Sequence, residues 1–231
     1  MQYLFTNGCS YSKPRTVPPY NVLLTVGEEV AKYYNLQHIN FAQGGRGNDR
    51  MFTTTVLYFL RNPERMKDTF AMIQLSSAGR IDYPLRKPRS QDDAMPGQDI
   101  SYMSMNIFKD NGQRFLNQNF SKIDQIQWLI MRYYNSVINL QNFFKQHNIK
   151  YLMYNGLETD INANKNDNDV LEAYVDKKHF FGWNNRDLVH YNFCKDNNII
   201  LENDGHASEQ GVLQYSKLLT DYIQKQQLLS L

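Results

Sequence analysis

Three residues, Ser10 near the start of the chain and Asp204 and His206 near its end, have the side chains that serine acyl transfer requires. A serine hydroxyl becomes a strong nucleophile when a base within hydrogen-bond reach takes its proton, and a histidine oriented by an acid is a common base. His206 stands in a turn before a helix, with Asp204 two residues ahead of it. We therefore expect Ser10 as nucleophile, His206 as base and Asp204 as orienting acid. Asn203, whose amide oxygen could accept the imidazole N–H, is the alternative to Asp204.

A glycine-rich turn, Gly44-Gly45-Arg46-Gly47-Asn48, offers hydrogen-bond donors for the same reaction. The backbone N–H of Gly45 and the side-chain amide of Asn48 could stabilise the oxyanion of a tetrahedral intermediate. Ser77 is a possible substitute for Asn48. Structural interpretations stand beside these: Ser10 as a turn residue, the glycines as a tight turn and Asn48 as a helix cap.

These candidate residues follow apolar runs that alternate with helical patterns, which predicts parallel strands connected by helices. Because the carboxyl ends of parallel strands meet at one edge of a sheet, we expect the candidates to lie together on that edge. The predicted fold class is α/β, with a five-stranded parallel sheet in a three-layer α/β/α arrangement. Strands are predicted at 3–6, 36–42, 69–75, 151–154 and 199–201, and helices at 20–34, 48–60, 123–144 and from Ser208, the expected N-cap.

No repeat or linker divides the sequence, so we expect a single domain over 1–231. Residues 80–120 show no periodicity and predict an irregular insertion over the site. Residues 160–169 place oxygen side chains at spacings similar to a calcium loop. Lys165 stands where that loop needs glycine and Leu171 where it needs glutamate, so we assign no metal.

Three blocks of the sequence resemble the SGNH (GDSL-type) hydrolase superfamily. Residues 8–11 (Gly-Cys-Ser-Tyr) resemble its first block, with Cys9 in place of the aspartate. Residues 40–45 resemble the second block, in which Gly45 would be the oxyanion glycine, and residues 204–208 resemble the last block, with acid and base. The resemblance implies a flavodoxin-like fold and esterase activity on a small ester, with an O-acetylated carbohydrate as one candidate.

The sequence departs from the family pattern at two functional positions. Residues 76–80 replace the family's Gly-x-Asn-Asp block, so its oxyanion asparagine has no direct counterpart. The family's acid stands three residues before the histidine, where this chain has Asn203. A second hypothesis is therefore a catalytically silent domain that binds a glycan or a partner protein in the same place. A nucleotide site at the glycine-rich turn ranks last, because the turn lacks the P-loop and dinucleotide patterns.

Composition excludes several classes of protein. The 231 residues carry a formal net charge of +2, are 42% hydrophobic and have a mean hydropathy of −0.61. Basic residues are scattered, so we expect neither nucleic acid nor membrane as a partner. Only two cysteines occur, which argues against a disulfide framework and favours a cytoplasmic location. We expect a small-molecule ester as the partner and no cofactor; the sequence specifies no oligomeric state.

Overall fold

A five-stranded parallel sheet forms the centre of the molecule. The computed structural model describes residues 1–14, 22–85, 94–95, 98–106, 125–158, 170–201 and 205–229. Strand order is β2-β1-β3-β7-β8, the 2-1-3-4-5 order of flavodoxin-like sheets, and every neighbouring pair is parallel. This confirms the predicted fold class. The strands are β1 (Tyr3–Asn7), β2 (Gln37–Asn40), β3 (Thr69–Leu75), β7 (Lys150–Asn155) and β8 (Phe180–Phe181).

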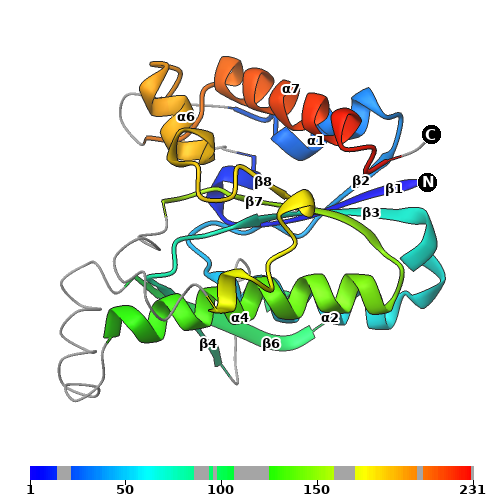
Figure 1. The fold of residues 1–231 in the computed structure, drawn as a ribbon, viewed down its shortest axis with the longest axis vertical. Helices are drawn as coiled ribbons and strands as arrows, with labels where there is room; N and C mark the ends of the chain where they lie inside the picture. Colours follow the sequence, from blue (N-terminus) through cyan, green and yellow to red (C-terminus); the bar gives the residue numbers. More distant parts are fainter. Residues whose placement is uncertain are drawn as a thin grey trace.

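Helices cover both faces of this sheet and complete three layers (Figure 1). One face carries α1 (Val26–Tyr33), α6 (His190–Asp196) and α7 (Glu209–Lys225), and the other carries α2 (Asn48–Arg61) and α4 (Gln125–Gln146). Short 3-10 turns lie at Ser10–Ser12 (η1), Pro63–Asp68 (η2), Lys177–His179 (η4) and Arg186–Leu188 (η5). Among the described helices, none is long and apolar enough to span a membrane.

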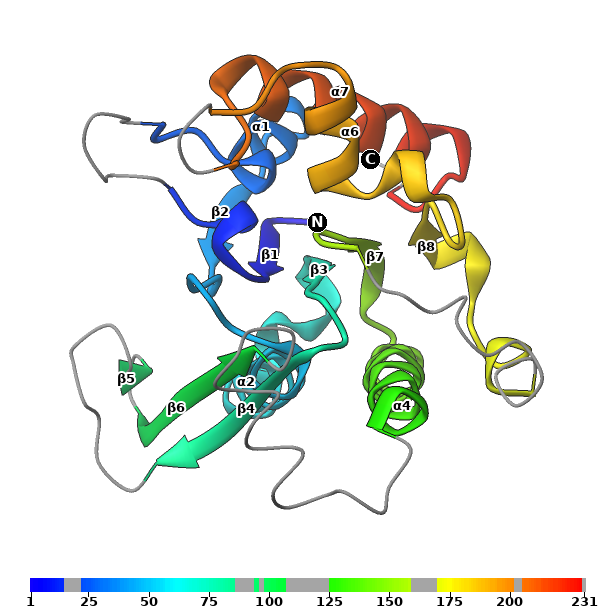
Figure 2. The same cartoon turned by 90° about the vertical axis from the view of Figure 1, so that its left-hand side faces the viewer.

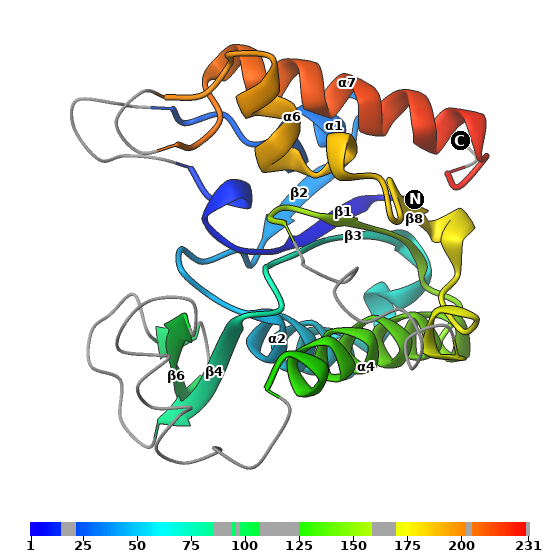
Figure 3. The same cartoon turned by 60° about the vertical axis from the view of Figure 1, so that its left-hand side comes forward.

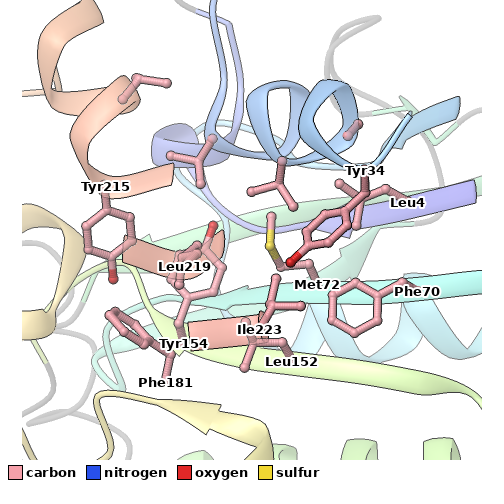
Figure 4. Packing of buried hydrophobic residues seen from close by; sticks show 14 of the residues in the cluster. Leu4, Tyr34, Phe70, Met72, Leu152, Tyr154, Phe181, Tyr215, Leu219 and Ile223 are labelled. Atoms are coloured by element: carbon pink, nitrogen blue, oxygen red, sulfur yellow. The ribbon is translucent and has the colours of Figure 1, made fainter. Parts of the chain in front are cut away.

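The strands supply alternate side chains to two apolar cores, one on each face. In β1, Leu4 packs toward α1 and α7, whereas Phe5 packs toward α2 and α4; both are fully buried. Figure 4 shows the first of these cores, in which Met72 and Leu152 from the sheet meet Leu219 from α7. The period-2 alternation of the strands explains why each one feeds both layers.

The fifth strand is not where the sequence predicts it. Phe180 and Phe181 form β8 at the edge of the sheet, beside β7. Residues 199–201 instead fold back on the segment before α7, where Ile200 forms an isolated antiparallel bridge with Ala207. An apolar run of three residues fits a hairpin arm as well as a sheet strand, because both bury alternate side chains. Ser208 caps α7 through its hydroxyl, as predicted.

The predicted irregular insertion contains a second sheet. β4 (Arg80–Leu85), β5 (Ala94–Met95) and β6 (Gln98–Asn106) form a three-stranded antiparallel sheet of order β4-β6-β5. Figures 2 and 3 show β4 and β6 beside α2. The expectation of irregular structure is wrong for these strands. Pro84 interrupts the sequence pattern, but β4 is an edge strand, where a missing N–H is tolerated.

Helix α1 starts later than the predicted residue 20. It begins at Val26, where the Thr25 side chain accepts the Glu28 N–H. Residues 15–21, which include the start of the predicted helix, are not among those described. The segment 160–169, to which the sequence assigns no metal, also lies outside the described residues.

Candidate active site

Ser10 lies in the turn that follows the central strand β1. The last residue of the strand, Asn7, fixes this turn because its side-chain amide donates to Thr54 Oγ1 at 2.6 Å and Thr55 Oγ1 at 3.0 Å, and its Oδ1 accepts the Gly8 N–H at 2.9 Å. A β-carbon on Gly8 would lie 2.8 Å from Ser12 Oγ, closer than packing allows. The turn therefore presents Ser10, which is 9% exposed, at the carboxyl edge of the sheet.

His206 reaches Ser10 from the far end of the chain. Its Nε2 atom lies 2.8 Å from Ser10 Oγ, within hydrogen-bond reach. The Tyr11 ring stacks on the imidazole, with centroids 4.7 Å apart and an interplanar angle of 23°, and the Tyr11 hydroxyl donates to the Gly205 carbonyl. Leu201 N–H donates to the His206 carbonyl at 2.7 Å and ties this turn to the bridge before α7. The geometry allows proton transfer from the hydroxyl to the imidazole.

The orienting group for His206 was expected at Asp204, with Asn203 as its alternative. Both lie in 202–204, outside the described residues. The acid therefore stays a prediction from the sequence.

The glycine-rich turn lies beside the serine. Gln43 N–H donates to the Gly8 carbonyl at 3.1 Å, and a β-carbon built on Gly44 would lie 3.8 Å from Cβ of Ser10. Gly45 has a φ of +73°, which favours glycine, and no residue of the described part of the chain except its two neighbours lies within 4 Å of where its β-carbon would be. Its role as an oxyanion donor stays a prediction.

The side chain of Asn48 connects the start of α2 to Ser76, the residue that follows β3. It is 5% exposed, donates from Nδ2 to the Ser76 carbonyl at 3.1 Å and accepts the Ser76 N–H at 2.8 Å. These bonds fix the start of α2 to the end of β3. The Ser77 hydroxyl accepts the Gly79 N–H at 3.2 Å and so shapes the turn that leads into β4. Both side chains have structural bonds, and whether either also donates to an oxyanion is untested.

A buried polar chain behind the serine turn was missed in the sequence. Cys9 Sγ donates to Gln74 Oε1 at 3.4 Å, and Gln74 Nε2 lies 3.1 Å from His190 Nδ1. Burial, and to a smaller extent the charge of His206, lowers the pKa of His190 to about 3. Gln74 was the available signal, because it is a polar residue in the otherwise apolar run 70–75. Through Cys9, the residue before Ser10, this chain of hydrogen bonds supports the serine turn.

Among the described residues, no group of three or more His, Cys, Asp or Glu side chains could hold a metal ion. A hydroxyl, an imidazole and an exposed glycine turn side by side suit acyl transfer.

The sequence matches no protein-family model, and no curated protein matches it. Among solved structures, the protein YXIM from Bacillus subtilis superposes with a TM-score of 0.52 at 11% identity, over 98% of this chain and 57% of that chain. This chain thus spans little more than half the length of that protein. A member of the lipolytic G-D-S-L protein family from Veillonella parvula gives 0.47 at 13% identity over 97% of both chains.

A carbohydrate esterase, described as having an active site with divergent catalytic and non-catalytic binding functions, gives a TM-score of 0.43 at 12% identity, over 97% of this chain and 68% of that chain. The strand order and the two helical layers show that this chain has the flavodoxin-like α/β/α fold that its resemblance to SGNH hydrolases implies. The superposition on YXIM is a similarity of fold.

Proposed function

We propose that this protein is a serine esterase that hydrolyses a small ester. The observation that carries the proposal is the 2.8 Å separation between Ser10 Oγ and His206 Nε2. A domain that only binds a ligand has no physical need to hold a serine hydroxyl against an imidazole at the rim of the sheet. General-base assistance of this kind contributes roughly 10²–10⁴ to a rate.

The reaction runs in two steps. Ser10 Oγ attacks the acyl carbonyl carbon while its proton moves to His206 Nε2, and the imidazolium then protonates the departing alcohol. In the second step a water molecule attacks the acyl carbon while His206 takes a proton from the water. The bond between the acyl carbon and Ser10 Oγ then breaks, and the imidazolium returns the proton to Ser10 Oγ. Asp204 is the proposed acid that orients the imidazole, with Asn203 as the alternative.

The oxyanion of each tetrahedral intermediate needs donors already in place. The proposed donors are the backbone N–H groups of Ser10 and Gly45 and the second hydrogen of the Asn48 amide, with Ser77 as the substitute. The space beside Gly45 supports this assignment, because no described residue except its two chain neighbours lies within 4 Å of the position a β-carbon would take. One such donor contributes about 10²–10³ to the rate.

The proposed substrate is a short acyl ester, for example an acetyl group on a carbohydrate. The three sequence blocks around Ser10, Gly45 and His206 support this class. The rival hypothesis is a silent domain that binds a glycan or a protein partner at the same rim, and the experiment below separates the two.

A fluorophosphonate probe tests the proposal directly, because it forms a covalent bond with an activated serine. We expect the wild type to be labelled, Ser10→Ala not to be labelled, and His206→Ala to be labelled at least a hundredfold more slowly. Ser136→Ala is the matched control, since its hydroxyl donates to the Arg132 carbonyl within α4, and it should react like the wild type. Labelling that does not depend on Ser10, or no labelling of the wild type, would refute the esterase and favour the binding domain.

A further inference from the structure

The inserted sheet places a buried carboxylate at the start of α2. Asp82 lies in β4 opposite Ser104 of β6 and is 6% exposed. Its Oδ1 accepts the Gly47 N–H at 2.9 Å, and its Oδ2 accepts the Arg50 N–H at 3.0 Å. The Ser104 hydroxyl also donates to Oδ1. The carboxylate thus joins the inserted sheet to the helix that begins just after the glycine-rich turn.

This contact replaces a cap that the helix lacks in its own sequence. The N-cap of α2 is Gly47, which has no side chain, and the first N–H groups of a helix have no partner within the helix. Asp82 accepts two of them, those of Gly47 and Arg50, from a strand 35 residues beyond Gly47 in the chain, and its negative charge suits the positive end of the helix. Burial raises the pKa of Asp82, while the bonds from Ser104, Arg50 and Gly47 lower it.

The fit between the two backbones is close. A β-carbon on Gly47 would lie 2.6 Å from the Arg80 carbonyl oxygen and 3.0 Å from Asp82 Oδ2. A glycine is therefore required at this N-cap by the approach of β4, even though its φ of −100° is open to any residue. The contact depends on both residues. Gly47 leaves room for the backbone of β4, and Asp82 of β4 accepts the Gly47 N–H.

The same contact fixes one end of the turn that faces Ser10. At the other end, the Arg50 guanidinium donates to the Phe41 carbonyl at 3.2 and 3.3 Å. Between these ends, the described backbone bond from Gln43 N–H to the Gly8 carbonyl ties the turn to the serine turn. Gly44 and Gly45 are exposed and follow this bond, so the direction of their N–H groups depends on how firmly the Gly47 end is held.

We propose that Asp82 is a positioning residue for acyl transfer, which holds the Gly44–Gly45 turn so that the Gly45 N–H is directed at the oxyanion. The proposal rests on the esterase function proposed above. Asp82 acts through the backbone of Gly47 and has no described contact with Ser10. The inserted sheet then belongs to the catalytic apparatus because it anchors the turn.

The test uses Asp82→Asn and the milder Ser104→Ala. An asparagine can accept one of the two N–H groups, but its own amide hydrogens would oppose the other. Asp176→Asn is the matched control: Asp176 is also a paired carboxylate, bonded to Lys145 and to Tyr151 at the opposite end of β7. Each variant is assayed for hydrolysis of p-nitrophenyl acetate, and hydrogen exchange is followed in the peptide that contains residues 43–48.

We expect Asp82→Asn to lower kcat about tenfold to a hundredfold with KM within about twofold, because a misplaced donor affects the transition state more than substrate binding. Ser104→Ala should lower kcat about threefold, and Asp176→Asn should match the wild type. Exchange in the 43–48 peptide should rise only in the first two variants. An unchanged kcat or unchanged exchange in Asp82→Asn, or an equal loss in Asp176→Asn, would overturn the proposal. A wild type without Ser10-dependent hydrolysis is a different result, since it refutes the esterase itself and removes the basis of this inference.

Discussion

His190 should make this protein sensitive to mild acid. The side chain is fully buried, and its ring stacks on Tyr215 with centroids 4.1 Å apart. Its Nδ1 atom lies 3.1 Å from Gln74 Nε2, and among the described residues its Nε2 atom has no hydrogen-bond partner. An imidazolium at this position would be a buried charge without an acceptor, which is unfavourable. Burial accordingly lowers the pKa of His190 from 6.5 to about 3.

The sign and size of the effect follow from proton linkage. The unfolded chain binds a proton at this residue as the pH falls through its ordinary pKa of 6.5, whereas the folded protein does not until about pH 3. Between those limits the unfolded state holds one more proton, so the free energy of unfolding falls by about 1.4 kcal/mol for each pH unit. Burial lowers the pKa of His38 to about 4, so above that pH this residue adds a similar decrease in the free energy of unfolding for each pH unit. Together the two histidines should remove about 2–3 kcal/mol between about pH 6 and pH 5, out of a typical total of roughly 5–15 kcal/mol.

His190→Gln isolates one of these protons, because glutamine can still accept a hydrogen bond from Gln74 but does not titrate. Urea unfolding, followed by circular dichroism at several values between about pH 7 and pH 5, gives the free energy of unfolding at each pH. The variant should be less stable than the wild type near neutral pH, since the stacked ring is lost. Its stability should nevertheless fall less steeply in acid, by about 1.4 kcal/mol per unit. Parallel curves for the two proteins would refute the assignment of a neutral His190.

Three further predictions concern the rim of the sheet. Tyr11→Phe removes the hydrogen bond to the Gly205 carbonyl and should slow probe labelling of the serine about tenfold with little loss of stability; unchanged labelling would contradict this. Asn48→Ala removes both bonds to Ser76 and should lower the free energy of unfolding by about 2–4 kcal/mol, measured in urea; a smaller loss than about 1 kcal/mol would show that the bonds are replaced. Gly47→Ala should destabilise by about 1–3 kcal/mol, because its new carbon meets the β4 backbone; an equally stable variant would show that β4 moves freely.

The sheet could be predicted from the sequence as far as local apolar runs define its strands. The runs 3–6, 69–75 and 151–154 are observed as β1, β3 and β7, since each alternates its side chains between two cores. The edge strand β8 has only two residues, Phe180 and Phe181, and pairs with β7 across the chain. A strand of this length depends on its pairing with β7, and two residues are too few to show a periodic pattern in the sequence. The run 199–201 predicts a strand, but it forms the hairpin arm that pairs with the segment containing His206.

The proximity of Ser10 and His206 could be predicted for a reason of topology. Each residue follows a segment that ends at the carboxyl edge of the sheet or beside it, and a parallel sheet gathers such turns whatever their separation in sequence. The prediction did not require the correct fifth strand. It required only that the turn before α7 lie at that edge. The Ser208 cap and the bridge between Ile200 and Ala207 place the turn there.

The residues that hold the rim in place were harder to find, because their partners are backbone groups of distant segments. Asn7 bonds to α2, Asn48 to the end of β3 and Asp82 to the start of α2, across 28 to 48 positions of sequence. No periodicity marks such residues, since each is a single buried polar side chain, either at the end of an element (Asn7, Asn48) or within a short strand (Asp82). A buried polar group must nevertheless find a partner, and a partner that is backbone fixes the path of the chain there.

A buried amide binds the segment after β3 to the start of α2. Ser76 gives its N–H and carbonyl to the Asn48 side chain, so the end of β3 is bound to α2 by an amide from the glycine-rich turn. The segment then continues into β4, and Asp82 returns to the same helix start. Both bonds act on α2 just after the Gly44–Gly45 turn. On the esterase proposal, a firmly held turn keeps the Gly45 N–H directed at the oxyanion, so weakening Asp82 should lower the rate of hydrolysis more than loss of an ordinary helix cap would.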